Sequence, residues 1–343
     1  MNVKVLVEGG TPETSEGRQT LLSYINSNQY DEIVYDNSRE HEVAWFREDD
    51  FIEKIYPALE KTKTFLICFL NGERNYDEFL ETHPFVKIIR TPHHFFRVVY
   101  DEYNKKIQDI RNYSVDKFET NFIYLNGKPH PYRCHLMDLF QASNKMKNYK
   151  YTWCWTQKDM GKDPPVYIFH NWDEVNVHHE EGINKNTIID QTKLDVDLKP
   201  FAQLISESQI DYFFLTEKTV KALLLKQPFL VYGSVGYHQK LKEMGFQLYD
   251  ELFDYSFDSI EDSSIRGQLI IKEFEKISEV DTKEMYKILE PKVIHNLNKS
   301  IEIKDSYQDN KEIVDYIKER IEFFRNALVI GNIHCANLKK LIL

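Results

Sequence analysis

The stretch 212–246 constrains the fold more than any other part of the chain. An apolar run at 212–215 is followed by a Thr-Glu-Lys tripeptide and a short amphipathic helical pattern that a proline ends. A second apolar run, 229–232, leads into a Gly-Ser turn and a further helical pattern. A strand, a helix and a second strand in this order predict a βαβ unit, and therefore an α/β fold with parallel strands.

The rest of the chain shows the same alternation. In its first third, strands are expected at 3–7, 32–35, 64–70 and 86–90, with helices at about 18–26, 50–61, 77–82 and 94–107. Later strands are expected at 121–125, 149–155 and 201–206, and later helices at 132–143, 264–277, 282–299 and 310–325. Alternating strands and helices predict parallel, doubly wound sheets.

Length and patterning predict more than one domain. The chain has 343 residues, of which 42% are hydrophobic, and a polar stretch at 111–120 separates two sets of alternating elements. We therefore expect a Rossmann-like domain at 1–112, a second one at 113–309 and a C-terminal helical segment at 310–343.

Charge and cysteine usage exclude some classes of protein. The net charge of −11 argues against nucleic acid as the main partner, because phosphate contacts normally require a basic protein. The net charge does not exclude a local basic cleft. The four cysteines form no CxxC pair, and no signal peptide or long apolar segment is visible. We expect a soluble, cytoplasmic protein that does not bind membranes.

The residues that follow the two apolar runs of the βαβ unit suggest nucleotide binding. In parallel sheets, ligands bind outside the carboxyl ends of the strands. Glu217 can accept hydrogen bonds from ribose hydroxyls, and the ammonium of Lys218 or Lys221 can bind a phosphate. Gly233 and Ser234 allow the backbone to approach a ligand closely.

Each of these residues also has an ordinary structural explanation. Thr216 has the chemistry of a helix N-cap. Glu217 and Lys221 are four residues apart and form a common stabilising pair on a helix. A Gly-Ser pair occurs in many turns, and this one is not a GxGxxG fingerprint.

The sequence TEKTVKALLLKQPFLVYGS, residues 216–234, resembles the donor-binding segment of fucosyltransferase-like and exostosin-like glycosyltransferases. The Gly-Tyr…Gly-Phe run that follows resembles a form of this segment common in phage and large-virus proteins. The resemblance covers 212–246 of the 343 residues. It implies two Rossmann-like domains that face a central cleft (the GT-B fold) and a UDP- or GDP-sugar donor.

By resemblance, Glu217 would bind the ribose and Lys218 the phosphates, with Lys221 assisting. A second segment, NGKPHPYR at 126–133, lies between an expected strand and an expected helix. In the resembled enzymes an arginine on this helix meets the donor pyrophosphate, and Arg133 occupies the matching position. A guanidinium suits this role because it presents paired donors and stays charged. Lys128 and His130 depart from the more arginine-rich loop of the family.

For the reaction, the resemblance implies an inverting sugar transfer to a hydroxyl acceptor, a glycan. Such a transfer needs a base for the acceptor hydroxyl and positive charge for the leaving diphosphate. Side chains commonly supply that charge in two-domain transferases, so we expect no metal. The base should come from the first domain, where the candidates at strand ends are Glu8, Glu73, His93 and His94. Of these we favour Glu8 and His93.

Other motifs and functions stay open. Asp195-Val196-Asp197 matches the short metal-binding pattern Asp-x-Asp but follows no apolar strand, and the histidines at 178–179 lack the spacing of HExxH. We interpret both as solvated surface. Alternative functions are a glycosyltransferase acting on a modified base in phage DNA, and an inactive protein that binds carbohydrate or nucleotide. A viral protein would act in the host cytosol.

Overall fold

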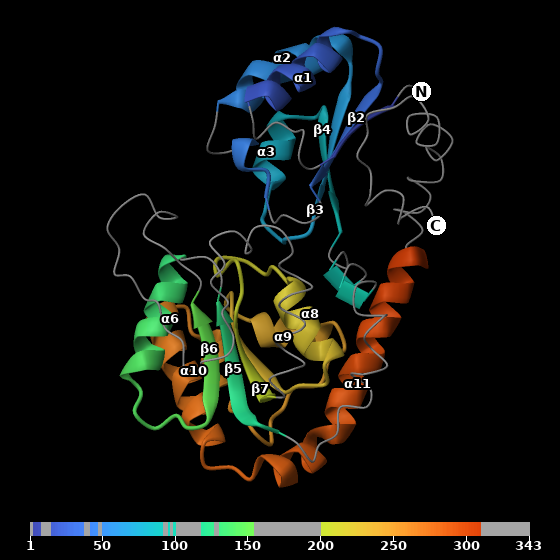
Figure 1. Cartoon of the computed structure of the whole chain (residues 1–343). Helices are drawn as coiled ribbons and strands as arrows, with labels where there is room; N and C mark the ends of the chain where they lie inside the picture. Colours follow the sequence, from blue (N-terminus) through green and yellow to red (C-terminus); the bar gives the residue numbers. More distant parts are fainter. Residues whose placement is uncertain are drawn as a thin grey trace. The chain divides into compact units, whose positions relative to one another are not determined.

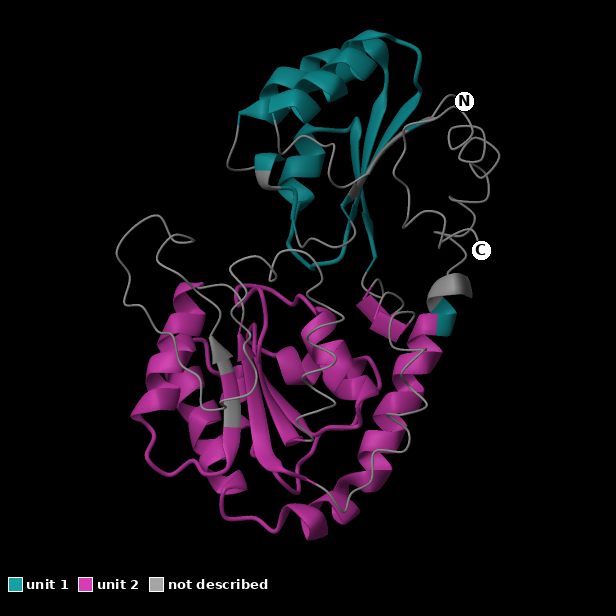
Figure 2. Ribbon diagram, viewed as in Figure 1, with its two compact units in different colours: residues 1–94, 305–343 teal, residues 95–304 magenta. Residues whose placement is uncertain are grey.

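The computed structural model describes residues 3–7, 15–37, 42–46, 50–91, 95–96, 99–100, 118–126, 130–153 and 200–309. The chain divides into two compact units (Figure 2). Unit 1 comprises residues 1–94 and 305–343, and unit 2 comprises residues 95–304. Each unit contains one four-stranded parallel sheet, so the predicted α/β class with two parallel-sheet domains is confirmed. The sequence places the domain limits near 112 and 309. Residue 112 lies outside the described ranges and residue 309 is the last residue of one, so these limits stay a prediction.

Unit 1 alternates strands with helices on a single sheet. Its elements are β1 (Val3–Val7), α1 (Ser15–Asn26), β2 (Glu32–Asn37), η1 (Ala44–Phe46), α2 (Phe51–Thr62), β3 (Phe65–Leu70), α3 (Asp77–Thr82) and β4 (Val86–Arg90). The strands lie in the order β1-β2-β3-β4, and every pair is parallel. α2 contributes Phe51, Ile55 and Leu59 to the core, as expected from apolar residues spaced at helical intervals.

Unit 2 has a different strand order. Its elements are β5 (Thr120–Asn126), α6 (Pro131–Ala142), β6 (Tyr149–Trp153), β7 (Pro200–Ser206), α8 (Glu217–Leu224), β8 (Phe229–Tyr232), α9 (Tyr237–Glu243), η4 (Ser256–Ser259), α10 (Ser263–Ile277) and α11 (Thr282–Asp309), of which residues 305–309 belong to unit 1. The strands lie in the order β6-β5-β7-β8 and are all parallel.

The order β6-β5-β7-β8 places a topological switch point between β5 and β7. From β5 the chain moves through α6 to β6 on one side, whereas β7 lies on the other side and continues through α8 to β8. Because crossovers are right-handed, the two directions put α6 and α8 on opposite faces of the sheet, as Figure 1 shows. At such a point the segments that leave neighbouring strands diverge and open a crevice for a ligand.

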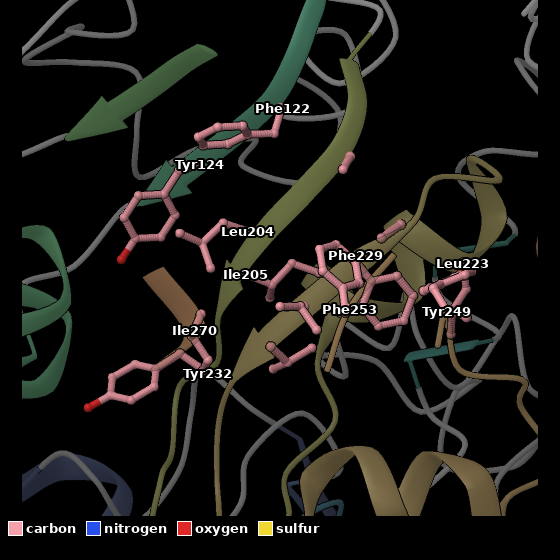
Figure 3. Packing of buried hydrophobic residues seen from close by; sticks show 14 of the residues in the cluster. Phe122, Tyr124, Leu204, Ile205, Leu223, Phe229, Tyr232, Tyr249, Phe253 and Ile270 are labelled. Carbon is pink, nitrogen blue, oxygen red and sulfur yellow. The ribbon is translucent and has the colours of Figure 1, made fainter. Parts of the chain in front are cut away.

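The core of unit 2 is strongly aromatic. Its central strand β7 is buried along its whole length. Figure 3 shows Phe122 and Tyr124 of β5 together with Leu204 of β7 and Ile270 of α10 in this cluster. All of β7 is enclosed, and so is Glu207 directly after it, so Ser208 is the first partly exposed residue of this segment.

Hydrogen bonds with η4 and β8 fix the start of α9. The carboxylate of Asp258 accepts hydrogen bonds from the backbone N of His238 at 3.1 Å and of Gln239 at 2.9 Å, and it lies 2.7 Å from His238 Nδ1. His238 Nε2 accepts from the backbone N of Val231 at 3.0 Å, so the neutral ring carries its hydrogen on Nδ1 and donates it to Asp258. This arrangement fastens α9 to β8.

The predicted strand at 212–215 is wrong. These residues form an irregular segment, and the strand of the βαβ unit is β7. Both edges of β7 are paired, with β5 and with β8, so the place in the sheet that precedes α8 is already filled by β7 and not by the later run. Phe214 and Leu215 are nevertheless buried, which explains their apolar character.

Near the C-terminus, α11 runs to Asp309, beyond the expected end at 299, and the helix expected at 310–325 lies outside the described residues. None of the helices in the described ranges combines the length and the apolar composition that crossing a membrane requires.

Candidate functional site

The switch point of unit 2 gathers the polar residues of the candidate site. β7 ends at Ser206 and is followed by Glu207 and Ser208, while Arg133 lies in the first turn of α6, the next described helix after β5. Pro131 occupies the first turn of α6, where a missing backbone N–H costs nothing. The turn therefore brings Arg133 to the carboxyl end of the neighbouring strand.

Arg133 is a buried arginine that caps β7. Its Nη2 donates to the carbonyl oxygens of Ser206 at 3.1 Å and Glu207 at 2.8 Å, and its Nε donates to the Glu207 carbonyl at 3.2 Å. Nη2 also lies 3.4 Å from the hydroxyl of Ser208. The side chain is only 3% exposed. Arg133 is thus a structural element of the strand end, which the sequence pattern did not predict.

Lys218 approaches the same place from α8. Thr216 is the N-cap of this helix and accepts from the backbone N of Lys218 at 3.3 Å. The Lys218 ammonium donates to Glu217 Oε1 at 3.0 Å, to Thr216 Oγ1 at 3.2 Å and to Ser208 Oγ at 3.2 Å. The side chain is 21% exposed, so a ligand can displace one of these contacts.

Ser208 joins the two cations. Its hydroxyl oxygen accepts hydrogen bonds from both Arg133 and Lys218. Nη2 of Arg133 and Nζ of Lys218 therefore lie no further apart than the sum of their distances to this oxygen. Two accepted hydrogen bonds occupy both lone pairs of the oxygen. The hydroxyl hydrogen is then left to donate, and no acceptor for it occurs among the described residues. Three donors of this kind around one point suit an anion.

Glu217 and Lys221 lie on α8 as the sequence predicts. Burial raises the pKa of Glu217, but the charge and hydrogen bond of Lys218, with a smaller effect of Lys221, outweigh burial and lower it. Glu217 therefore stays ionised, and its side chain is 20% exposed. The Lys221 side chain is among the buried residues of α8.

Gly233 has a clear packing role. A Cβ at this position would lie 2.6 Å from Cδ2 of Tyr237, so only glycine allows the ring to lie here. The carbonyl of Gly233 accepts from Nη2 of the buried Arg266 at 3.0 Å. The neighbouring hydroxyl of Ser234 is buried and has no hydrogen-bond partner among the described residues. Gly236, with φ of +70°, is the N-cap residue that precedes α9.

Glu207 was missed by the sequence interpretation. Its carboxylate is fully buried and accepts hydrogen bonds from Thr216, Thr219 and Tyr237. The available signal was an acidic residue directly after a buried strand. The run at 212–215 is not a strand, so the strand end that carries the acidic residue is that of β7 and not the one expected at 215.

Several predicted residues lie outside the described ranges. They are Glu8, His93, His94, Lys128, the His-His-Glu-Glu segment at 178–181 and the Asp-x-Asp motif at 195–197. His130 is described and occupies the N-cap position of α6, with its ring stacked on Tyr132 at 5.5 Å between centroids. Glu73 is exposed after β3. In the part of the chain that the structure describes, no group of three or more His, Cys, Asp or Glu side chains is arranged to hold a metal ion.

Comparisons with known proteins yield one similar structure. No protein-family model matches the sequence, and no curated protein matches it. The similar structure is a crystal structure titled as T4 phage BGT in complex with its UDP-glucose substrate. The similar region comprises 89% of this chain and 81% of the phage protein, with 11% sequence identity and a TM-score of 0.43. A similarity at this level carries no weight for the function of this chain.

Proposed function

We propose that this chain is a glycosyltransferase that moves a sugar from a nucleotide-sugar donor, UDP- or GDP-linked, to a hydroxyl group of an acceptor glycan. One observation carries the proposal. Arg133 and Lys218, from separate segments, both donate to the Ser208 hydroxyl at the switch point between β5 and β7. Ligands of open α/β sheets bind at this place, and a diphosphate is the anion that the two cations suit.

In the proposed complex, Lys218 exchanges its contact with Ser208 for an oxygen of the donor diphosphate. Arg133 and the Ser208 hydroxyl complete the group of donors. Glu217 lies next to Lys218 and accepts hydrogen bonds from the ribose hydroxyls, which an ionised carboxylate does well. Gly233 and Ser234 form the neighbouring turn, and the unpartnered Ser234 hydroxyl offers one further polar contact.

The proposed reaction inverts the sugar carbon. A bond forms between the acceptor oxygen and the anomeric carbon, while the bond from that carbon to the donor phosphate oxygen breaks. The base removes the hydroxyl proton, and the nucleoside diphosphate leaves with the electron pair of the broken bond. The charges of Arg133 and Lys218 stabilise the leaving group, so we propose that the transfer needs no metal ion.

For the base we propose Glu8 or His93 of unit 1. An inverting transfer requires a side chain that accepts the proton of the acceptor hydroxyl at neutral pH, and both residue types can do so. We expect Glu8→Gln or His93→Asn to lower the turnover number strongly and to leave donor binding unchanged. If a substitution lowers the affinity for the donor and not the turnover number, the residue binds the donor and is not the base.

Donor binding and turnover test the proposal. The chain is screened by thermal shift against UDP-, GDP- and CMP-sugars, and the stabilising donor is then used to measure sugar transfer. We expect Arg133→Ala and Lys218→Ala to abolish transfer, with circular dichroism reporting whether each variant folds. Lys276→Ala is the matched control, because Lys276 pairs with Glu273 on α10 and touches none of the site residues.

Each other outcome has a defined meaning. Transfer at the wild-type rate in both Arg133→Ala and Lys218→Ala refutes the proposal. Stabilisation by a nucleotide sugar without any transfer shows a binding protein in place of an enzyme. Transfer to modified DNA and not to glycans identifies a base-modifying transferase.

A further inference from the structure

Glu207 is a fully buried carboxylate next to the candidate site. Its Oε1 accepts from the backbone N of Thr216 at 3.2 Å, from Thr219 Oγ1 at 2.7 Å and from the hydroxyl of Tyr237 at 3.0 Å. Its Oε2 accepts from Thr216 Oγ1 at 2.5 Å. No described cation forms an ion pair with it. A buried charge is costly unless hydrogen bonds satisfy it, and here four donors do so.

The hydroxyl of Thr216 connects this carboxylate to Lys218. Its oxygen accepts from the backbone N of Lys218 at 3.3 Å and from the Lys218 ammonium at 3.2 Å. These two contacts occupy both lone pairs, so the hydroxyl must donate its hydrogen. The acceptor is Oε2 of Glu207. The carboxylate therefore sets the orientation of the hydroxyl, and the hydroxyl holds the Lys218 side chain.

The other donors hold Glu207 in place. Thr219 lies in the first turn of α8, and Tyr237 begins α9, where its ring packs against Gly233. Burial and the charge of Glu207 both raise the pKa of Tyr237, so the phenol keeps its hydrogen and donates it. One carboxylate thus links the end of β7 with the starts of α8 and α9.

We propose that Glu207 is a positioning residue for donor binding: its carboxylate holds Thr216 in the orientation that presents the Lys218 ammonium to the donor diphosphate. This inference rests on the proposed function, because it names the residue that prepares the same site. Glu207 itself does not touch the donor.

Glutamine tests the charge at nearly constant size. Three donors face Oε1, so the amide oxygen of Glu207→Gln takes that position and the amide nitrogen faces Thr216 Oγ1. Both lone pairs of Thr216 Oγ1 are in use, and the two donors then oppose each other. Thr216→Val removes the same hydroxyl link without changing Glu207, and Thr216→Ser keeps the link.

Isothermal titration with UDP measures the effect. We expect Glu207→Gln and Thr216→Val each to weaken UDP binding about tenfold, the usual effect of losing one hydrogen bond to a charged group, and Thr216→Ser to restore most of the affinity that valine loses. Glu273→Gln is the matched control. Glu273 is a buried carboxylate on α10 that accepts from the backbone of Asp254 and from Lys276, and its variant should bind UDP like the wild type.

A double-mutant cycle separates positioning from general damage. If Glu207 acts through Lys218, Glu207→Gln should change UDP affinity less than about twofold once Lys218 is methionine, because coupled residues are non-additive. Equal weakening in both backgrounds overturns the proposal, as does wild-type affinity of Glu207→Gln. If the glutamine variant does not fold, Thr216→Val takes its place in the cycle.

Hydrogen exchange supplies a readout without a ligand. We expect the amides of Thr216 and Lys218 to exchange faster in Glu207→Gln than in Glu273→Gln, because the first substitution loosens the start of α8. Unchanged exchange at these amides overturns the positioning role. If the wild-type chain binds no UDP or other nucleoside diphosphate, the proposed function fails, whereas exchange still reports on the Glu207 network by itself.

Discussion

Lys218→Met separates donor binding from stability. Methionine keeps the length of the side chain and removes the charge and its three contacts. The ammonium is partly exposed, and its partners are two hydroxyls and one carboxylate at 3.0 Å. A partly solvated ion pair of this kind contributes at most about 1 kcal/mol, so we expect only a small change in the free energy of unfolding.

The effect on a bound diphosphate should be larger. The complex loses one charge-assisted hydrogen bond, which is worth about 1.5–3 kcal/mol in a partly buried site. This corresponds to UDP binding that is about 10- to 100-fold weaker. The two magnitudes differ because the free protein offers Lys218 one partly solvated carboxylate and two hydroxyls, whereas the bound diphosphate adds a further anion to these partners.

Isothermal titration of UDP and urea denaturation measure the two quantities on the same variants. Lys276→Met is the control, since it removes a lysine that pairs with a glutamate elsewhere in unit 2. The reasoning is refuted if Lys218→Met binds UDP as tightly as Lys276→Met does. It is also refuted if the loss of UDP affinity is accompanied by a stability loss of several kcal/mol, because the residue would then act through the fold.

Three further predictions follow from buried groups of unit 2. Arg133→Met should lower the free energy of unfolding by about 2–4 kcal/mol in urea denaturation, because it leaves the Ser206 and Glu207 carbonyls without their charged donor; an unchanged unfolding midpoint would contradict the capping role. Gly233→Ala should cost about 1–3 kcal/mol by overpacking against Tyr237, whereas Gly267→Ala, whose Cβ would lie 3.4 Å from its nearest neighbour, should be neutral or stabilising; thermal unfolding of the two variants compares them. Burial raises the pKa of Asp258, but hydrogen bonds from His238 and from the amide of Gln239 outweigh burial and lower it. Its contribution to stability is therefore complete above about pH 4 and is lost as the pH falls through the folded-state pKa. Asp258→Asn should cost about 2 kcal/mol at pH 7 and progressively less below pH 4, and a cost independent of pH would exclude the charge as its cause.

The α/β class could be predicted from the sequence because buried strands and amphipathic helices have different periods. The helix at 217–224 is marked by Thr216 at its start and by Pro228 after its end, and both signals act locally. The apolar run at 212–215 was misleading, since burial alone does not distinguish a strand from an irregular segment. Strand pairing decides between them, and pairing depends on neighbours far away in the sequence.

The composition of the site was only partly predictable. Lys218 and Arg133 could be proposed because cations after buried strands are suited to phosphate. Their common contact, Ser208, could not, because it depends on β7 lying between β5 and β8. The same holds for Glu207, whose donors are 9, 12 and 30 residues away in the chain. No periodic pattern encodes a hydrogen-bond network of this kind.

A crystal structure of the chain with bound UDP tests the central claim most directly. The claim predicts that the β-phosphate lies within hydrogen-bond distance of the Lys218 ammonium and of the Arg133 guanidinium or the Ser208 hydroxyl, with the ribose beside Glu217. UDP bound at another place in the molecule, or with its phosphates in contact with neither Lys218 nor Arg133, would contradict it.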